Sequence, residues 1–160
     1  AEHCRANYTD LALGIGSVVD TGTAALYISL GADFIVSPML VEALAPLCNR
    51  RKVGWMPGCF TPAEIGRAEE LGAEIVKLFP GDAVAPGFIK SVLAPSPRTQ
   101  IMVTGGVKPE QENLRRWFGG GAVAVGMGSA LLRKDLLSAG DYAGIKVLAA
   151  EALQLVQEVR

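Results

Sequence analysis

The side chain with the clearest chemical potential is Lys77, which lies inside a short apolar run, IVKLFPG, over residues 75–81. Alternate side chains of an extended strand share a face, so Lys77 shares one with Ile75 and Phe79. A lysine held in an apolar interior loses hydration of its ammonium group, its pKa falls, and the neutral amine can attack a ketone to form a Schiff base. The alternative is a lysine on an edge strand whose ammonium group reaches solvent. The spacing alone leaves both interpretations open.

Two glycine-rich turns end the last two apolar runs, VTGGV over 103–107 (the first glycine turn) and VGMGSALL over 125–132 (the second glycine turn). Glycines let the backbone approach an anion closely, and a helix beginning at Ser129 would add the positive end of its dipole. Either turn alone is equally explained as a tight connection from strand to helix. Because two of them follow one another, we expect a phosphate-binding, substrate-binding site at Thr104, Gly105, Gly106, Gly128 and Ser129.

Weaker candidates lie at the ends of earlier runs. GIGS over 14–17 is by default a turn, but Ser17 occupies the same strand end as Lys77, and Ser37 and Pro38 do so as well. We therefore expect Ser17 to hydrogen-bond a ligand held over these strand ends. Asp82 is the only acid expected near such a site. Five glutamates at helix starts or on exposed faces, the basic run and the single histidine are expected on the solvated surface: Glu64, Glu69, Glu70, Glu110, Glu112, Arg50, Arg51, Lys52 and His3.

The elements that must position these residues form a repeating unit: an apolar run, a Gly, Pro or Ser turn, and a helical pattern. The first four runs have the same spacing, because Ser17, Ser37, Pro57 and Lys77 follow one another at intervals of 20 residues. Six such runs occur, over residues 11–18, 34–38, 53–58, 75–81, 101–106 and 122–129.

Helix ends are visible between the runs. Thr61 is a plausible N-cap with Glu64 as its capping-box partner, and Gly72 would close that helix. Asp20 can cap a helix that runs to Gly31, and Pro109 can open one before Gly119. We also expect a long helix over 141–159.

Strands that alternate with helices imply parallel strands joined by right-handed crossovers. The fold class is therefore α/β, either an open six-stranded sheet or a (β/α)₈ TIM barrel. Such a barrel typically needs about 250 residues and at least about 200. The 160 residues here offer about six βα units. If the fold is a barrel, residues 1–160 form a single domain whose first two βα units precede Ala1.

Composition excludes several classes of protein. The chain is 50% hydrophobic and 19% charged with a net charge of -1, which favours one compact domain and argues against nucleic acid as a partner. No apolar run approaches the roughly 20 residues of a membrane span. Three widely spaced cysteines and one histidine favour neither a disulfide framework nor a metal site, so we expect no metal, no cofactor and a cytoplasmic location.

The order and spacing of GIGS, FIVSP, IVKLFPG and IMVTGGV closely resemble the 2-keto-3-deoxy-6-phosphogluconate (KDPG) and 4-hydroxy-2-oxoglutarate aldolases, over essentially the whole chain. The resemblance implies a class I aldolase, a lyase of carbohydrate metabolism that forms a Schiff base on a (β/α)₈ barrel. It also implies a homotrimer that cleaves a phosphorylated keto sugar acid to pyruvate and glyceraldehyde 3-phosphate.

Single residues follow the resemblance. Lys77 matches the Schiff-base lysine, Phe79 the aromatic beside it and Pro38 a proline of the pocket wall. Ser17 stands where the family commonly has a threonine that contacts the pyruvate carboxylate. The phosphate-binding turns match at Gly105, Gly106 and Ser129, although Met127 replaces a glycine that many members have.

One part of the family pattern has no counterpart here. The resemblance implies a general acid/base glutamate and a carboxylate-binding arginine in an E-x-T-x-R-like motif, which these 160 residues lack. We expect both residues before Ala1, in agreement with the length argument; a chain complete as given would be a damaged enzyme. Two alternatives stay open: a phosphate-binding isomerase or epimerase with a charged lysine, and a non-catalytic trimeric scaffold.

Overall fold

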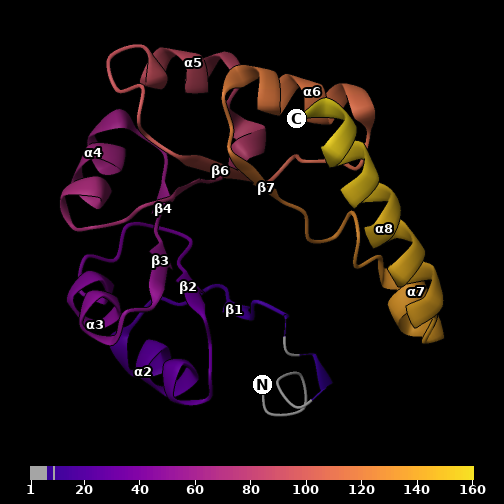
Figure 1. The fold of residues 1–160 in the computed structure, drawn as a ribbon, viewed down its shortest axis with the longest axis horizontal. Coiled ribbons are helices and arrows are strands. Elements are labelled where there is room, and N and C mark those ends of the chain that lie inside the picture. The colour runs from indigo at the N-terminus through magenta and orange to yellow at the C-terminus, as the bar shows by residue number, and fades with distance from the viewer. Residues whose placement is uncertain (1–6, 9) are drawn as a thin grey trace. The chain divides into compact units, whose positions relative to one another are not determined.

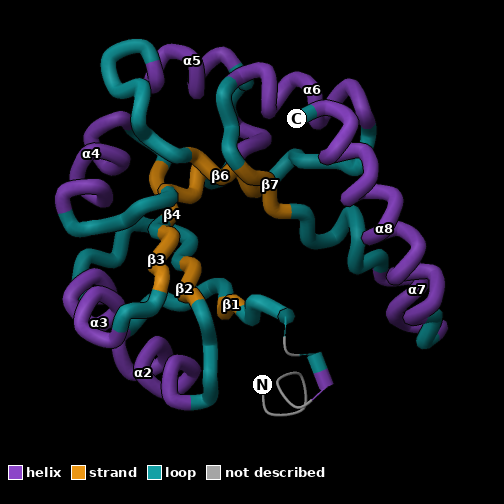
Figure 2. Tube along the Cα trace, in the orientation of Figure 1, coloured by secondary structure: helices purple, strands orange, loops and turns teal. Residues whose placement is uncertain are grey.

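The computed structural model describes residues 7, 8 and 10–160, so the expectation for His3 lies outside the described residues. Parallel strands alternate with helices along the chain (Figures 1 and 2). The chain divides into two compact units, residues 1–79 and residues 80–160. The strands are β1 (Gly14–Ile15), β2 (Phe34–Val36), β3 (Gly54–Met56), β4 (Gly58–Cys59), β5 (Val76–Leu78), β6 (Ile101–Thr104) and β7 (Ala124–Gly126).

In the first unit, three strands pair in parallel in the order β1-β2-β3, with Ile35 opposite both Ile15 and Trp55. The helices α2 (Thr21–Ser29), α3 (Leu44–Arg51) and α4 (Pro62–Glu70) connect successive strands. In Figure 1, α2 and α3 lie beside one another along this sheet. Helices α2 and α3 thus cover strands whose central residue, Ile35, is fully buried.

The segment from Gly54 to Cys59 changes its paired neighbour at Pro57. Before Pro57, β3 pairs with β2; after it, β4 pairs with β5, with Gly58 opposite Lys77. Proline has no backbone N–H, but its carbonyl accepts a hydrogen bond of 2.8 Å from the Lys77 amide. This bond places Lys77 beside the middle of the segment.

In the second unit, β6 and β7 pair in parallel, with Thr104 opposite Gly126. A 3-10 turn (η1, Gly81–Ala83) and α5 (Gly87–Leu93) precede β6, and α6 (Gln111–Gly120) connects β6 to β7. The helices α7 (Lys134–Ala139) and α8 (Tyr142–Val159) follow, and α8 packs against α6 and α7. Buried Ile101 and Val103 alternate with half-buried residues along β6, so one face of β6 is in the core.

The predicted helix ends at Asp20, Thr61 and Gly72 are confirmed. The Asp20 carboxylate accepts a hydrogen bond of 2.8 Å from the Thr23 amide at the start of α2. Thr61 and Glu64 form the complete capping box of α4. Gly72 follows this helix with a φ of +92°, a left-handed conformation that favours glycine.

Two predicted helix starts are wrong. Pro109 does not open α6, which begins at Gln111 with Glu110 as N-cap and ends before Gly121 at φ +107°. No helix begins at Ser129: the amides of Leu131 and Leu132 both donate to the Gly128 carbonyl, which makes a turn, and α7 begins only at Lys134. The second glycine turn therefore has no helix dipole at Ser129.

The predicted α/β class is confirmed, and the described residues contain six βα units when β3 and β4 are counted as one strand. The long helix expected over 141–159 is α8, capped by the Asp141 carboxylate. Among the described residues, no helix is both long and apolar enough to cross a membrane.

Candidate active site

Lys77 lies in β5 with only 9% of its surface exposed. Its neighbours in the strand, Val76 and Leu78, are fully buried, and its Nζ atom lies 4.3 Å from the centre of the Phe79 ring. Burial removes water from the ammonium group and lowers the pKa of Lys77. The structure therefore decides between the two interpretations that the spacing left open: Lys77 is buried and is not a solvated lysine at a sheet edge.

Gly58, directly opposite Lys77 in β4, leaves room for a neighbouring loop. A Cβ atom on Gly58 would overlap the carbonyl of Pro38 and lie 2.6 Å from the Met39 nitrogen. The peptide between Pro38 and Met39 thus packs on the residue paired with Lys77. This contact places Pro38 against β4, the strand paired with that of Lys77, and Gly58 is a neighbour of Lys77 that the sequence analysis missed.

Ser17 follows β1 at an exposed position and has a φ of 60°. A left-handed conformation is strained for a residue other than glycine and is frequent at functional sites. The next amide, that of Val18, donates to the Val36 carbonyl at the end of β2. Ser17 and Pro38 therefore lie at the ends of two adjacent parallel strands. Ser37, the residue before Pro38, is fully buried.

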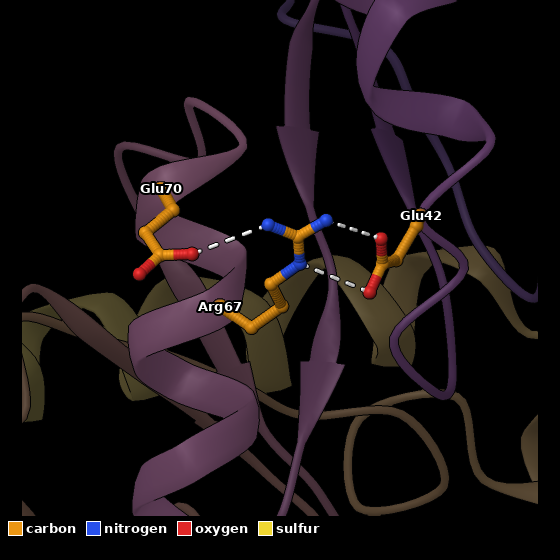
Figure 3. Close-up of polar contacts among 3 residues, drawn as sticks. All are labelled: Glu42, Arg67 and Glu70. Carbon is orange, nitrogen blue, oxygen red and sulfur yellow. Dashed lines mark hydrogen bonds and ion pairs between the residues drawn. The ribbon is translucent and has the colours of Figure 1, made fainter.

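An ion pair ties the loop after Pro38 to α4, as Figure 3 shows. The Arg67 guanidinium donates to both carboxylate oxygens of Glu42, over 2.7 and 3.1 Å, and to Glu70 over 3.2 Å. Planar two-bond pairing of this kind fixes orientation as well as distance. Glu42 closes the loop that begins at Pro38, so this pair limits where the loop can lie.

The first glycine turn follows β6 in the second unit. Gly105 and Gly106 have φ values of +97° and +69°, and both pack closely on the turn at Gly81 and Asp82. A Cβ on Gly106 would lie 2.8 Å from the Cβ of Asp82. Asp82 therefore lies beside the first glycine turn within the second unit, whereas its expected place near the strand ends that carry Ser17 and Lys77 stays a prediction.

The second glycine turn lies next to the first. Thr104 pairs with Gly126, and a Cβ on Gly126 would lie 2.7 Å from the Thr104 hydroxyl oxygen. Gly128 and Ser129 follow β7 at exposed positions. Thr104 and both glycine turns therefore belong to one end of the β6–β7 pair.

The predicted site residues divide between the units. Ser17, Pro38, Lys77 and Phe79 belong to the first unit, whereas Thr104, Gly105, Gly106, Gly128 and Ser129 belong to the second. Among the described residues, no group of three His, Cys, Asp or Glu side chains could hold a metal ion. Two described cysteines, Cys48 and Cys59, are buried free thiols.

The sequence of this chain is similar to one family of known proteins. Residues 1–148 match the sequence model of the family described as "KDPG and KHG aldolase". The 2-dehydro-3-deoxy-phosphogluconate aldolase of Haemophilus influenzae is 31% identical over 96% of this chain and 72% of its own length. The 2-dehydro-3-deoxy-6-phosphogalactonate aldolase of Escherichia coli K12 is 36% identical over 79% of this chain and 62% of its own length.

A solved structure shows the same likeness. The "4-hydroxy-2-oxoglutarate aldolase/2-deydro-3-deoxyphosphogluconate aldolase from TTHB1" superposes with a TM-score of 0.81 and 30% identity. It covers 97% of this chain and 73% of that one. The TIM-barrel-like fold class is thereby confirmed, and the relatives favour an aldolase over the isomerase and scaffold alternatives. The chain spans 62% to 73% of the length of these three relatives and belongs to the KDPG and KHG aldolase family.

Proposed function

We propose that this protein is a class I aldolase that cleaves 2-keto-3-deoxy-6-phosphogluconate, or its galactonate epimer, to pyruvate and glyceraldehyde 3-phosphate. The observation that carries the proposal is Lys77, buried in β5 beside Phe79 in a chain of this family. The relatives include enzymes named for the gluconate and for the galactonate compound, so the family leaves the epimer open. No cofactor takes part in the proposed reaction.

The proposed chemistry begins at the Lys77 amine. The neutral amine attacks the C2 ketone, and loss of water gives a protonated imine that acts as an electron sink. Removal of the C4 hydroxyl proton then lets the C3–C4 bond break, leaving pyruvate as an enamine on Lys77 and releasing the aldehyde. Burial supports this role because it increases the fraction of neutral amine at a given pH.

The remaining predicted residues bind the substrate in this proposal. The Ser17 hydroxyl donates a hydrogen bond to the pyruvate carboxylate, and Pro38 and Phe79 form the wall around the imine. Thr104 and the two glycine turns, including Gly128 and Ser129, bind the phosphate. Support comes from the strained backbone of Ser17, the contact of Pro38 with Gly58, and the left-handed glycines at the end of β6.

We further propose one barrel domain that works as a homotrimer in the cytoplasm. The relatives extend beyond the matched region, and we propose that additional βα units carry the acid/base glutamate and the carboxylate-binding arginine that the family resemblance implies. A related solved structure was built "by fusing symmetric oligomeric domains", which supports a multimer. The buried free thiols Cys48 and Cys59 are compatible with a reducing compartment.

Borohydride reduction in the presence of pyruvate tests the Schiff base directly. We expect the intact mass to rise by one reduced pyruvate adduct, which peptide mapping places on Lys77. Lys77→Ala should form no adduct and should lose cleavage activity while keeping its fold. Lys90→Ala, which removes an exposed lysine of α5, should form the adduct normally.

The outcomes separate the competing functions. A folded wild-type protein without an adduct would favour the isomerase, in which the lysine stays charged. An adduct that persists in Lys77→Ala would remove Lys77 from the mechanism. Sedimentation equilibrium of the same samples tests the trimer.

A further inference from the structure

The first glycine turn is held by a side chain that nothing in the sequence pattern singled out. Asn113 lies in the first turn of α6, where its side-chain Oδ1 accepts a hydrogen bond of 3.0 Å from the Lys108 amide. Its Nδ2 group donates over 3.3 Å to the Gly106 carbonyl. One amide side chain thus joins α6 to the Gly106 carbonyl and to the Lys108 amide, on either side of Val107.

These two bonds restrict the peptide groups on which anion binding depends. A trans peptide carries its C=O and N–H on opposite sides, so fixing the Gly106 carbonyl toward Asn113 points the Val107 N–H away from α6. Gly105 and Gly106 need this external support because glycine adopts many backbone conformations with similar energy. Without Asn113, the peptide between Gly106 and Val107 would be freer to rotate.

The opposite side of the turn is supported by packing alone. The Gly105 carbonyl oxygen lies close enough to Gly81 to contact a Cβ placed there at 2.6 Å, and Asp82 contacts Gly106. The turn is therefore held between the Gly81–Asp82 backbone and Asn113. Among the described residues, Asn113 is the only side chain that forms a hydrogen bond with this turn, at the Gly106 carbonyl, and it also accepts one from Lys108 just beyond the turn.

We propose that Asn113 is a positioning residue that holds the first glycine turn in its phosphate-binding conformation. This proposal rests on the phosphate site of the proposed function. Asn113 acts through the backbone of Gly106 and Lys108, whose carbonyl and amide groups it fixes. Its effect is confined to substrates that carry a phosphate group.

Substitution of Asn113 should not unfold the protein. Its side chain is half-buried and borders a cavity of about 380 Å³ that Asp82, Gly106 and Arg116 also line. Asn113→Ala removes both hydrogen bonds. Asn113→Asp keeps an oxygen that can accept from Lys108 but loses the donor to Gly106, so it separates the two bonds. Glu112→Ala, at the exposed neighbouring position of α6, is the matched control.

The test compares aldol addition of pyruvate to glyceraldehyde 3-phosphate and to unphosphorylated glyceraldehyde. We expect Asn113→Ala to raise the KM for the phosphorylated aldehyde about tenfold, the effect of one to two lost hydrogen bonds. The KM for pyruvate and the rate with glyceraldehyde should stay unchanged. Asn113→Asp should also raise the KM for the phosphorylated aldehyde, and Glu112→Ala should behave as the wild type.

A binding measurement needs no turnover. Inorganic phosphate should raise the Tm of the wild-type protein, because a ligand that binds only the native state stabilises it. This rise should shrink in Asn113→Ala and persist in Glu112→Ala. The Tm without phosphate reports whether Asn113→Ala has simply weakened the fold.

The results that overturn the proposal are distinct from those that overturn the function. If the wild-type protein discriminates between the two aldehydes but Asn113→Ala does so equally well, Asn113 does not position the turn. Equal losses with both aldehydes would show a merely structural role. If the wild-type protein itself neither discriminates nor responds to phosphate, the phosphate site of the proposed function fails, and this proposal fails with it.

Discussion

The burial of Lys77 has a cost as well as a chemical use. Its ammonium group loses water in β5, and the ring of Phe79 at 4.3 Å offers only part of the interaction energy that water would supply. The lowered pKa of Lys77 expresses this cost, because desolvation is its cause. A neutral apolar side chain at this position would remove the cost along with the nucleophile.

We therefore expect Lys77→Met to be more stable than the wild type at neutral pH, by roughly 0.5–2 kcal/mol. Below the folded pKa of Lys77, the wild type has its full penalty, because the lysine is charged in both states. As pH rises from the folded pKa toward the unfolded value of about 10.5, the folded protein releases its proton first and the penalty disappears. Urea denaturation at several pH values measures how the difference in free energy of unfolding between Lys77→Met and the wild type changes with pH.

The control for this prediction is Lys90→Met, which replaces an exposed lysine of α5. Its stability relative to the wild type should not change over the same pH range. A constant difference between Lys77→Met and the wild type would contradict the burial argument, since it would come from packing and not from charge.

At single positions, the sequence predicts which residues are reactive better than it predicts contacts between residues far apart in the chain. The alternation of Ile75, Lys77 and Phe79 placed Lys77 and Phe79 on one face of the strand, but it left open whether Lys77 is buried or solvated, which the structure decides. Gly58 and Asn113 were missed for physical reasons. Gly58 matters through a close approach of the Pro38–Met39 backbone from another loop, and Asn113 through hydrogen bonds to a turn that only the folded chain brings near.

Among the elements, the loop after β2 depends on the ion pair between Glu42 and Arg67. Both side chains are about half exposed, so solvent and salt weaken their attraction. The two-bond geometry compensates in part by limiting the orientations of the loop. This pair should therefore affect how freely the loop moves more than it affects the stability of the protein.

Arg67→Met should speed amide hydrogen exchange in residues 39–43 by roughly two- to fivefold, as suits a partly exposed pair. Mass spectrometry of the exchanged peptides measures the change. Glu70→Gln is the control, because it leaves the bonds between Arg67 and Glu42 in place. At about 1 M salt the difference should shrink, since the attraction between partly exposed charges is then weakened by screening, while the direct hydrogen bonds at 2.7 and 3.1 Å remain.

Element prediction succeeded where side chains cap the helices themselves. Asp20 and Thr61 predict the starts of α2 and α4 because their side-chain oxygens accept hydrogen bonds from backbone amides three residues later. It failed after β7, where SALLRKDLLSAG continues a helical pattern from Ser129 although the chain first makes a turn. The Gly128 carbonyl accepts two amides there, and nothing in the local pattern distinguishes this turn from the first turn of a helix.

Across the whole molecule, the proposed chemistry divides between the two compact units. The lysine and the residues of the pyruvate pocket precede Pro80, and the glycine turns follow it. Schiff-base formation and phosphate binding should therefore respond to different substitutions. The alternation of strands and helices was sufficient to predict the α/β class, whereas the choice of a (β/α)₈ barrel over an open sheet came from the family resemblance. The division of the site residues between the units was not predictable, because the run 75–81 crosses the boundary.

Gly106→Ala tests this division. At a φ of +69° a Cβ is strained, and here it would also press on Asp82, so the first glycine turn must shift. We expect affinity for the phosphorylated aldehyde to fall about tenfold, or ~1.4 kcal/mol. The yield of borohydride-trapped pyruvate should be unchanged. Gly119→Ala, at a position in α6 with open space for a Cβ, should alter neither.

The burial of Cys59 makes the site observable without any assay of turnover. Cys59 pairs with Leu78 beside Lys77, and burial together with Glu64 and Glu69 raises the pKa of its thiol to about 12. Native Cys59 is therefore almost inert toward alkylating reagents, which attack the thiolate. Its modification requires transient opening of β4 and β5, so the alkylation rate of the peptide that contains Cys59, resolved from those of Cys4 and Cys48 by mass spectrometry, measures how often that opening occurs. Pyruvate reduced onto Lys77 should lower the alkylation rate of Cys59, because the adduct adds contacts that hold β4 and β5 together.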